Sequence, residues 1–425
     1  MEVPASHLRF PLFDSLRALA AISILVVHVS LFTVFITGPD YTYLGGFLAH
    51  LDVGVPFFFL LSAFLLYRPF VAARVEGREE PGFGGYGWRR FLRIAPAYWA
   101  VLVLSAIVPG MAGAFGQNWW VYWGLLQNLP VYEPVGRCAV DSYRCAIPPA
   151  WSLSIEVMFY ILLPLFVLGL AWIQRQRRSG SWLIPELAAI SLLALVSLPI
   201  QASTPTTDFH TVLFFSPIGR GLWFALGLAL ASVSVWVHQQ ESEPVWVGTI
   251  RRTAWAFVGA AVALYLVISF WVLEPSPSAA FPLTNDGTYM VQYVAFGLIA
   301  LLVILPATFG WQAGDRYRRF LRHKTTTWLG LISYGIFLWQ FPALIFMLDL
   351  GALDWWPEMD FAVLLVTTFA VTIACAAASY YLLERPIMRW GRRMLARRRS
   401  LPVPDPAVAA TEAASAPSSP PSSSA

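Results

Sequence analysis

Residues 13–30 read FDSLRALAAISILVVHVS, an apolar run with few polar interruptions. Runs of about 18 or more apolar residues can cross a bilayer as a helix, so this one predicts a transmembrane helix over 14–37. Arg17 and His28 are eleven residues apart within it. At about 100° per residue they share nearly one helix face, separated by about 16 Å of helical rise. Asp14 lies on nearly the same face, one turn before Arg17.

The same apolar pattern continues along the chain, of which 58% is hydrophobic and only 12% charged. A soluble domain carries about 25% charged residues, so most of this surface is expected to face lipid. The sequence predicts an all-α membrane protein with about ten transmembrane helices. The other nine are predicted over 47–70, 91–110, 150–172, 182–200, 214–237, 254–273, 288–310, 328–348 and 361–382. The shorter run 115–131 is predicted to be re-entrant or interfacial.

The placement of Lys and Arg predicts the orientation of these helices. Nearly all basic residues fall in the segments that are cytoplasmic if the N-terminus is inside, as the positive-inside rule requires. Arg137 and Arg144 lie in outer loops instead, and Arg17 and Arg220 lie within predicted spans. We therefore expect a multi-pass protein of the plasma (inner) membrane with both termini in the cytoplasm.

The chain divides into three predicted regions. Residues 1–13 form a short cytoplasmic N-terminus, and residues 14–390 form the membrane domain. Residues 391–425 are first basic and then rich in Pro, Ala and Ser, so we expect a disordered cytoplasmic tail. No cleavable signal peptide is expected, because the first apolar run is too long and lacks a clear cleavage site.

Charge and cysteine content exclude several classes of function. The net charge of +4 does not indicate nucleic-acid binding, because the basic residues sit in short loops between spans. Three cysteines are too few for a zinc site, and we expect no bound metal or cofactor. Cys138 and Cys145 share one outer loop and could form a disulfide there.

Ionisable residues inside a membrane are costly and often functional. An arginine at the cytoplasmic end of the first helix can hold phosphate, and a neutral buried histidine can act as a base or nucleophile. Arg17 and His28 would thus suit a long donor with an anionic head. The alternative is that Arg17 reaches the headgroups and His28 makes a structural hydrogen bond between helices.

Two arginines open the third predicted helix. Arg90 and Arg93 are one turn apart and share a face. They either anchor the helix at the cytoplasmic surface or, with Arg17, form a cationic pocket for nucleotide phosphates.

Two glutamates lie in or at the end of spans. Glu156 follows Ser152 by one turn, near the outer end of the fourth helix. It either has a catalytic role or pairs with Arg220 across the bundle. Glu384 precedes Arg385 and Pro386 at the expected end of the tenth helix. It either has a functional role or forms an ion pair at the helix end, where the proline would stop the helix.

Together these motifs resemble the acyltransferase-3 family of membrane acyltransferases, which includes bacterial O-acetylases of exopolysaccharide and of the O-antigen of lipopolysaccharide. The resemblance covers about residues 10–390. The matching motifs are Arg17 with His28; Arg90 with Arg93; Trp151, Ser152 and Glu156 in WSLSIEVMFY; GVPFFFLLSAFLL over 54–66; SYGIFLWQ over 333–340; and LERP over 383–386.

This sequence departs from the family pattern at three points. Gln340 stands where a histidine is common, and Ala63 stands where a glycine is common. The residues after 390 do not resemble the esterase-like domain that some members carry. Transfer onto an outer acceptor would therefore be completed by the bundle itself or by a separate acceptor-side partner protein.

The resemblance implies an O-acyltransferase that takes an acyl group, expected to be acetyl, from cytoplasmic acyl-CoA. The acceptor would be a hydroxyl of a glycan, glycolipid or related molecule. His28 and Glu156 would be catalytic, and Arg17, Arg90 and Arg93 would bind the donor. Asp14, Ser152, Arg220 and Glu384 would support the site or serve the acceptor. The rival hypotheses are a secondary transporter, which also buries charges at the midplane, and a non-catalytic membrane scaffold.

Overall fold

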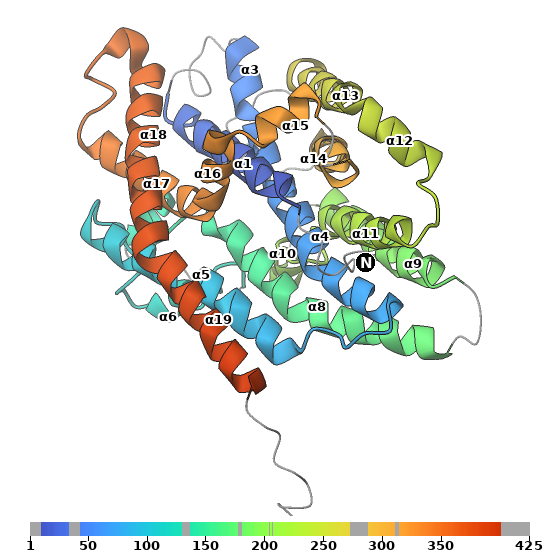
Figure 1. The fold of residues 1–425 in the computed structure, drawn as a ribbon. Helices are drawn as coiled ribbons and strands as arrows, with labels where there is room; N and C mark the ends of the chain where they lie inside the picture. The colour runs from blue at the N-terminus through green and yellow to red at the C-terminus, as the bar shows by residue number, and fades with distance from the viewer. Residues whose placement is uncertain are drawn as a thin grey trace, which may run out of the picture.

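The apolar runs form helices that pack side by side into a bundle (Figure 1). The computed structural model describes residues 10–33, 43–129, 137–176, 181–203, 205, 207–272, 288–310 and 314–400. The long elements are α1 (Leu12–Ser30), α4 (Gly54–Val75), α5 (Phe83–Ile107), α8 (Ala150–Gln176), α9 (Leu183–Ala202), α11 (Gly221–His238), α13 (Ala254–Val267), α14 (Thr288–Thr308), α17 (Ser333–Asp349), α18 (Asp360–Ser379) and α19 (Arg385–Ser400). The shorter ones are α3 (Tyr43–Ala49), α6 (Trp119–Trp123), α7 (Arg137–Val140), α10 (Asp208–Phe214), α12 (Val245–Arg252), α15 (Arg316–Leu321) and α16 (Lys324–Leu331).

The length and hydropathy of these helices confirm the prediction of a multi-pass membrane protein. Within the described ranges, eight helical segments are long and apolar enough to cross a bilayer. Two further pairs qualify together but are bent, α12 with α13 by 70° and α16 with α17 by 71°. The total is therefore eight to ten spans, in the same order along the chain as the ten predicted.

Several boundaries differ from the predicted ones. α1 ends at Ser30, whereas the sequence predicted a helix to residue 37, and residues 34–37 lie outside the described part. α5 begins at Phe83 and so holds the arginines inside its first turns. Arg220 was predicted within a span, but it is the residue that precedes α11. A short helix, α10, occupies the stretch before it, so the predicted helix over 214–237 begins later.

The predicted stop at Glu384, Arg385 and Pro386 is wrong. The chain passes from α18 through a π-helical turn over Tyr380–Glu384 directly into α19, which continues to Ser400. Pro386 directly follows this π-helical turn, in which the amide of Arg385 donates to the carbonyl of Tyr380, and such a turn accommodates an interruption of the regular helical hydrogen bonds. The basic first part of the predicted tail, residues 391–400, is therefore helical. Residues 401–425 lie outside the described part.

α4 and α1 lie at the centre of the bundle (Figure 1). Phe59 of α4 stacks on Phe224 of α11 at 4.8 Å between ring centroids, and Phe224 stacks on Phe159 of α8 at 4.3 Å. Gly330 of α16 is so close to the backbone oxygen of Asp14 that no larger residue would fit there. Gly54, at the start of α4, lies equally close to the backbone oxygen of Ala20 in α1, so α1 is packed tightly against both α4 and α16.

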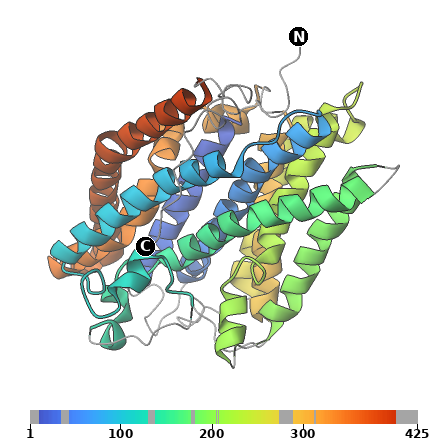
Figure 2. The same ribbon diagram turned by 90° about the horizontal axis from the view of Figure 1, so that it is seen from below.

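The basic segments gather at one end of the bundle. The hydroxyl of Ser15 donates to the carbonyl of Leu321 at 2.5 Å, and Nη1 of Arg318 donates to the carbonyl of Arg251 at 3.1 Å. At the other end, Arg144 forms an ion pair with Asp349. Figure 2 shows the bundle turned by 90° from the view of Figure 1, with the loops around α6 at the bottom. The two ends of the bundle thus differ in charge, and which of them is cytoplasmic stays a prediction.

The loops at that second end pack closely. Within its described part, residues 115–129, the predicted re-entrant or interfacial run contains only the short helix α6. The hydroxyl of Tyr98 donates to the carbonyl of Tyr122 in α6 at 2.7 Å. The question that the sequence left open about Cys138 and Cys145 is answered, because a disulfide joins them.

The orientation itself stays a prediction that reporter fusions can test. A reporter fused after Arg399 should be active only in its cytoplasmic form, because the basic end should remain inside. A fusion after Asp354, in the acidic loop at the opposite end, is the control and should be active only when exported. An exported signal after Arg399 would contradict the assigned sides of every helix.

Candidate active site

A narrow buried cavity of about 50 Å³ lies between α1, α4, α5, α8 and α17. It collects five of the nine side chains that the sequence singled out, although they are far apart in the chain. Its lining consists of Arg17, Val55, Phe58, Phe59, Ser62, Arg90, Arg93, Ile94, Ser152, Leu153, Glu156, Tyr160, Ser333, Tyr334 and Phe337. The prediction that Arg17, Arg90 and Arg93 form one cationic pocket therefore agrees with where the structure places them.

Glu156 is held by two hydroxyl groups at this cavity. The hydroxyls of Ser62 on α4 and Tyr160 on α8 both donate to its Oε1, the latter at 2.5 Å. Tyr160 is four residues after Glu156, so the two side chains lie on the same face of α8. The alternative partner, Arg220, makes its own contacts elsewhere. Glu156 thus faces the arginine-lined cavity, and two hydroxyl groups hold its side chain in place.

The three arginines give the cavity a surplus of positive charge. Arg17 lies 3.7 Å from Asp14, its neighbour one turn earlier on α1. Arg90 and Arg93 are one turn apart near the start of α5 and face Arg17. Nε of Arg90 is buried without a hydrogen-bond partner among the described residues. Buried donors are nearly always paired, so an unpaired one in a cationic cavity indicates room for an anionic ligand.

Ser152 and Glu384 lie beside this group. The hydroxyl of Ser152 is buried and donates to the carbonyl of Pro149 at 3.1 Å, one turn before Glu156 on α8. Glu384 accepts a hydrogen bond from Ser379 at 3.3 Å and interacts electrostatically with Arg93. It sits in the π-helical turn before α19, and such turns often occur at functional sites.

His28 is not part of the cavity lining. It lies in the last turn of α1, against α17. Its Nδ1 is 3.5 Å from Oε1 of Gln340, and its ring meets that of Phe341 edge-on at 5.3 Å between centroids. Nε2 of Gln340 donates to the carbonyl of Phe337 at 3.2 Å, which orients the amide oxygen toward the imidazole. An amide oxygen can only accept, so Nδ1 carries the proton and Nε2 of His28 keeps its lone pair.

Arg220 belongs to a different cluster. Its guanidinium donates to Gln201 at 2.9 Å and to the hydroxyl of Tyr289. It also lies 5.0 Å from the ring centroid of Phe214 and 5.2 Å from that of Trp223. The structure thus separates Arg220 from Glu156 and buries it among aromatic rings, where its cation–π contacts stabilise the start of α11.

The sequence did not single out four polar residues of the cavity, namely Ser62, Tyr160, Ser333 and Tyr334. The four-residue spacing between Glu156 and Tyr160 was a readable signal for one of them. Ser62 and Tyr334 are ordinary residues of apolar helices, and only the packing of α4 and α17 against α8 brings them to the site.

Comparison with known proteins adds an independent observation. The family described as an acyltransferase domain matches residues 11–381 of this chain, which covers every residue of the cavity and His28. Glu384 lies just beyond the matched range.

Three relatives align along nearly the whole chain. YrhL of Bacillus subtilis is 26% identical over 413 residues, which cover 92% of this chain and 57% of the relative. The peptidoglycan O-acetyltransferase OatA of Listeria monocytogenes is 26% identical over 401 residues, 90% of this chain and 56% of the relative. The O-acetyltransferase OatA of Staphylococcus aureus is 24% identical over 408 residues, 91% of this chain and 58% of the relative.

This chain therefore spans little more than half the length of these curated relatives. No solved structure matches it.

Proposed function

The chain belongs to the acyltransferase-domain family of multi-pass plasma-membrane proteins, and we propose that it is an O-acyltransferase that moves an acetyl group from acyl-CoA to a glycan hydroxyl. One observation carries this proposal. A single buried cavity brings together three arginines and a glutamate from three helices, and one of those helices continues to His28.

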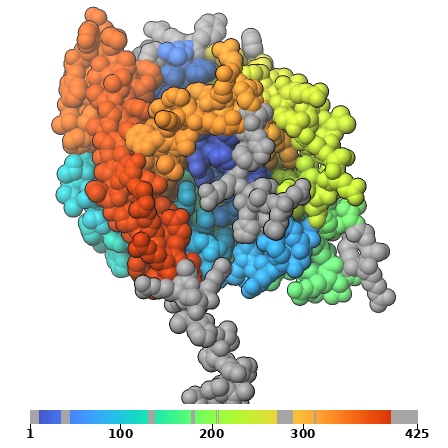
Figure 3. All heavy atoms as spheres, viewed as in Figure 1, coloured from blue at the N-terminus to red at the C-terminus, as the bar shows by residue number. Residues whose placement is uncertain are grey.

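The donor is proposed to enter from the basic end of the bundle. Figure 3 shows α1 at the floor of a hollow at that end, between the orange α15 and α16 and the red α19. Arg17, Arg90 and Arg93 would bind the phosphates of CoA, because a guanidinium offers paired donors that match phosphate oxygens. A cavity of about 50 Å³ is too small for a nucleotide, so the phosphates would stay at its arginine-lined mouth.

Two acidic residues would keep these arginines in place. Asp14 lies beside Arg17, and Glu384 interacts with Arg93. Each carboxylate limits the rotation of a long side chain, which lowers the entropy lost when the guanidinium binds phosphate.

His28 is proposed to act as the general base at the thioester. The hydroxyl oxygen of the acceptor attacks the thioester carbonyl carbon while Nε2 of His28 takes the hydroxyl proton. A C–O bond forms and the C–S bond breaks. The proton then passes from the imidazolium to the sulfur, which leaves an ester on the acceptor and CoA as a free thiol. Glu156, with Ser152 one turn away, would be the second catalytic group, at the donor cavity that it lines.

The acceptor is proposed to be a cell-envelope glycan. The name of the relative from Listeria monocytogenes gives peptidoglycan as its acceptor, which favours a cell-wall glycan over lipopolysaccharide. Arg220, at the end of the bundle opposite the basic segments, would serve this side, and a separate partner protein could complete delivery.

A cellular comparison tests the proposed reaction. Cells that express the chain should carry glycan-bound acetate that mild alkali releases, because an O-acetyl ester is cleaved by alkali and an N-acetyl group is not. Cells that express His28→Ala to the same membrane level are the control and should match cells without the chain. Equal amounts of alkali-released acetate in all three would contradict the proposal.

A further inference from the structure

A second and larger cavity, of about 440 Å³, lies in the loops at the other end of α5. Ala106, in the last turn of α5, lines it, whereas Arg90 lies near the start of that helix. Their separation of sixteen positions corresponds to about 24 Å of helical rise, so the two cavities open near opposite ends of the bundle. Its lining is Ala106, Met111, Ala112, Gly113, Phe115, Gly116, Gln117, Asn118, Tyr122, Arg137 and Cys138.

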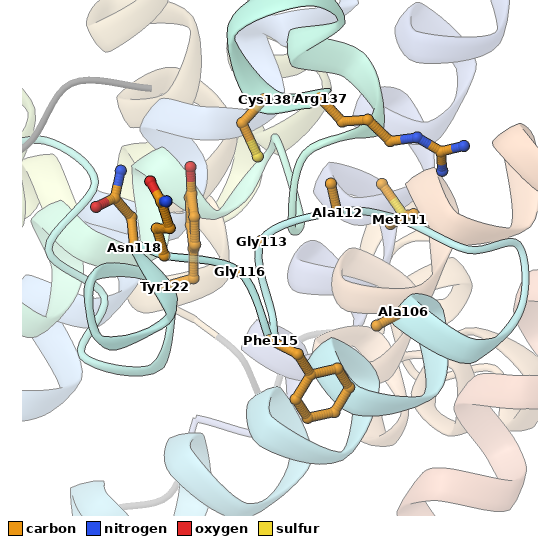
Figure 4. A pocket seen from close by; sticks show the side chains of 11 residues that line it. Ala106, Met111, Ala112, Gly113, Phe115, Gly116, Asn118, Tyr122, Arg137 and Cys138 are labelled. Carbon is orange, nitrogen blue, oxygen red and sulfur yellow. The ribbon is translucent and has the colours of Figure 1, made fainter. Parts of the chain in front are cut away.

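The lining of this cavity has the chemistry that a carbohydrate requires. Gln117 and Asn118 offer amide groups, and Tyr122 offers an aromatic ring, against which the C–H face of a sugar can pack. Figure 4 shows Tyr122 and Asn118 on one side of the cavity and Arg137 on the other. None of the eleven lining residues is acidic. The volume lies within the range of about 300–1,000 Å³ that is usual for small-molecule sites.

Arg137 adds a preference for negative charge. The one hydrogen bond that its side chain makes within the described ranges is a long contact, 3.5 Å from Nη1 to the carbonyl of Gly110. The guanidinium is therefore available for a carboxylate, which it binds through two parallel hydrogen bonds.

Several interactions hold the walls of the cavity together. The backbone of Ala112 pairs with Arg144 and Ala146 through two hydrogen bonds of 2.8 Å. The disulfide from Cys138 to Cys145 closes the same loop, and the ion pair of Arg144 with Asp349 ties it to the end of α17. A cavity with fixed walls loses little entropy when a ligand binds.

Two sets of contacts connect this cavity to His28. Met111, in the cavity wall, packs in one apolar cluster with Leu25 and Val29 of α1, which flank His28 in the chain. From the disulfide loop, the ring of Tyr143 stacks on Phe341 at 6.5 Å, and Phe341 meets the imidazole of His28. The cavity therefore adjoins the same end of α1 as His28, whereas the arginines adjoin the other end.

From this geometry we propose that the second cavity is the acceptor subsite, and that it binds one or two sugar residues of a glycan with a carboxylate facing Arg137. This inference rests on the proposed function for the reaction that follows binding, but the binding itself can be measured without a donor. Donor and acceptor would approach His28 from opposite ends of the bundle.

A substitution that fills the cavity tests the site. Gly116 lines it, and a Cβ atom added there meets no atom within 4 Å, so we expect Gly116→Trp to fold normally and to place its ring in the sugar site. Gly248 of α12 has equally open surroundings away from both cavities, which makes Gly248→Trp the matched control. The probe is the disaccharide of N-acetylglucosamine and N-acetylmuramic acid, titrated into purified full-length protein without donor. We expect Gly116→Trp to weaken binding at least tenfold and Gly248→Trp to leave it unchanged.

A second pair of variants tests the charge preference. Arg137→Gln should weaken binding of this acidic disaccharide at least tenfold and should change binding of neutral diacetylchitobiose by less than twofold. Arg319→Gln, at an exposed arginine of α15, is the control and should change neither. Equal losses for both sugars would overturn the carboxylate assignment.

The two proposals fail in different ways. If the wild-type protein does not bind the disaccharide, or if Gly116→Trp binds it as well as wild type, the acceptor subsite is wrong. Consumption of acetyl-CoA by the same preparation would then still support the proposed reaction. If the disaccharide binds at the cavity but acetyl-CoA is never consumed, the subsite stands and the proposed reaction fails.

Discussion

Replacing His28 with alanine should lower acyl transfer by about 10²–10⁴-fold, the usual effect of removing a general base. Binding of CoA should be unchanged, because His28 lies about 16 Å of helical rise from Arg17 and lines no part of the arginine cavity. The measurement is turnover per correctly folded molecule, with folded protein counted by size-exclusion chromatography in detergent.

His50 provides a matched control for this substitution. It is also buried, and its Nδ1 lies 2.9 Å from the carbonyl of Gly46, away from both cavities. His50→Ala should cost stability and leave turnover per folded molecule near that of wild type. A purely structural role for His28 would give the same pattern for His28→Ala, namely less folded protein with normal turnover.

Replacing Arg17 with alanine should weaken binding of CoA by about tenfold to 100-fold, since a hydrogen bond to a charged group contributes about 1.5–3 kcal/mol. Arg17→Lys should restore only part of this loss, because an ammonium group lacks the paired donors of a guanidinium. The measurement is equilibrium binding of CoA to the purified protein.

A ligand series separates phosphate binding from a general structural effect. Pantetheine has the same arm as CoA but no phosphate, so Arg17→Ala should leave its binding nearly unchanged. Arg316→Ala, at an exposed arginine of the basic end, should alter binding of neither ligand. Equal weakening of CoA and pantetheine by Arg17→Ala would contradict the assignment of Arg17 to the phosphates.

The number and order of the helices could be predicted because each span must satisfy its own backbone hydrogen bonds in lipid. The bends between α12 and α13 and between α16 and α17 could not, because hydropathy measures the length of an apolar run and not its direction. The continuation past Pro386 was missed for a related reason. A proline usually ends a helix, but the π-helical turn before Pro386 lets the chain continue into α19.

The site could be predicted in part. Charged residues in apolar helices are rare enough that Arg17, Arg93 and Glu156 stood out, and the cavity unites them. Their hydroxyl partners, and the amide of Gln340 beside His28, depend on how α4 and α17 pack against the other helices. Pairing of Glu156 with Arg220 was plausible from charge alone, but the two side chains belong to separate clusters.

The most direct test of the central claim follows a radiolabelled acetyl group through the purified protein. Wild type in lipid nanodiscs, given labelled acetyl-CoA and cell-wall glycan fragments, should place label on the glycan in an alkali-labile ester and release one CoA thiol for each acetyl group transferred. The same amount of folded His28→Ala should transfer at most about one hundredth as much. Label that remains on CoA with wild type, or equal transfer by both proteins, would contradict the claim.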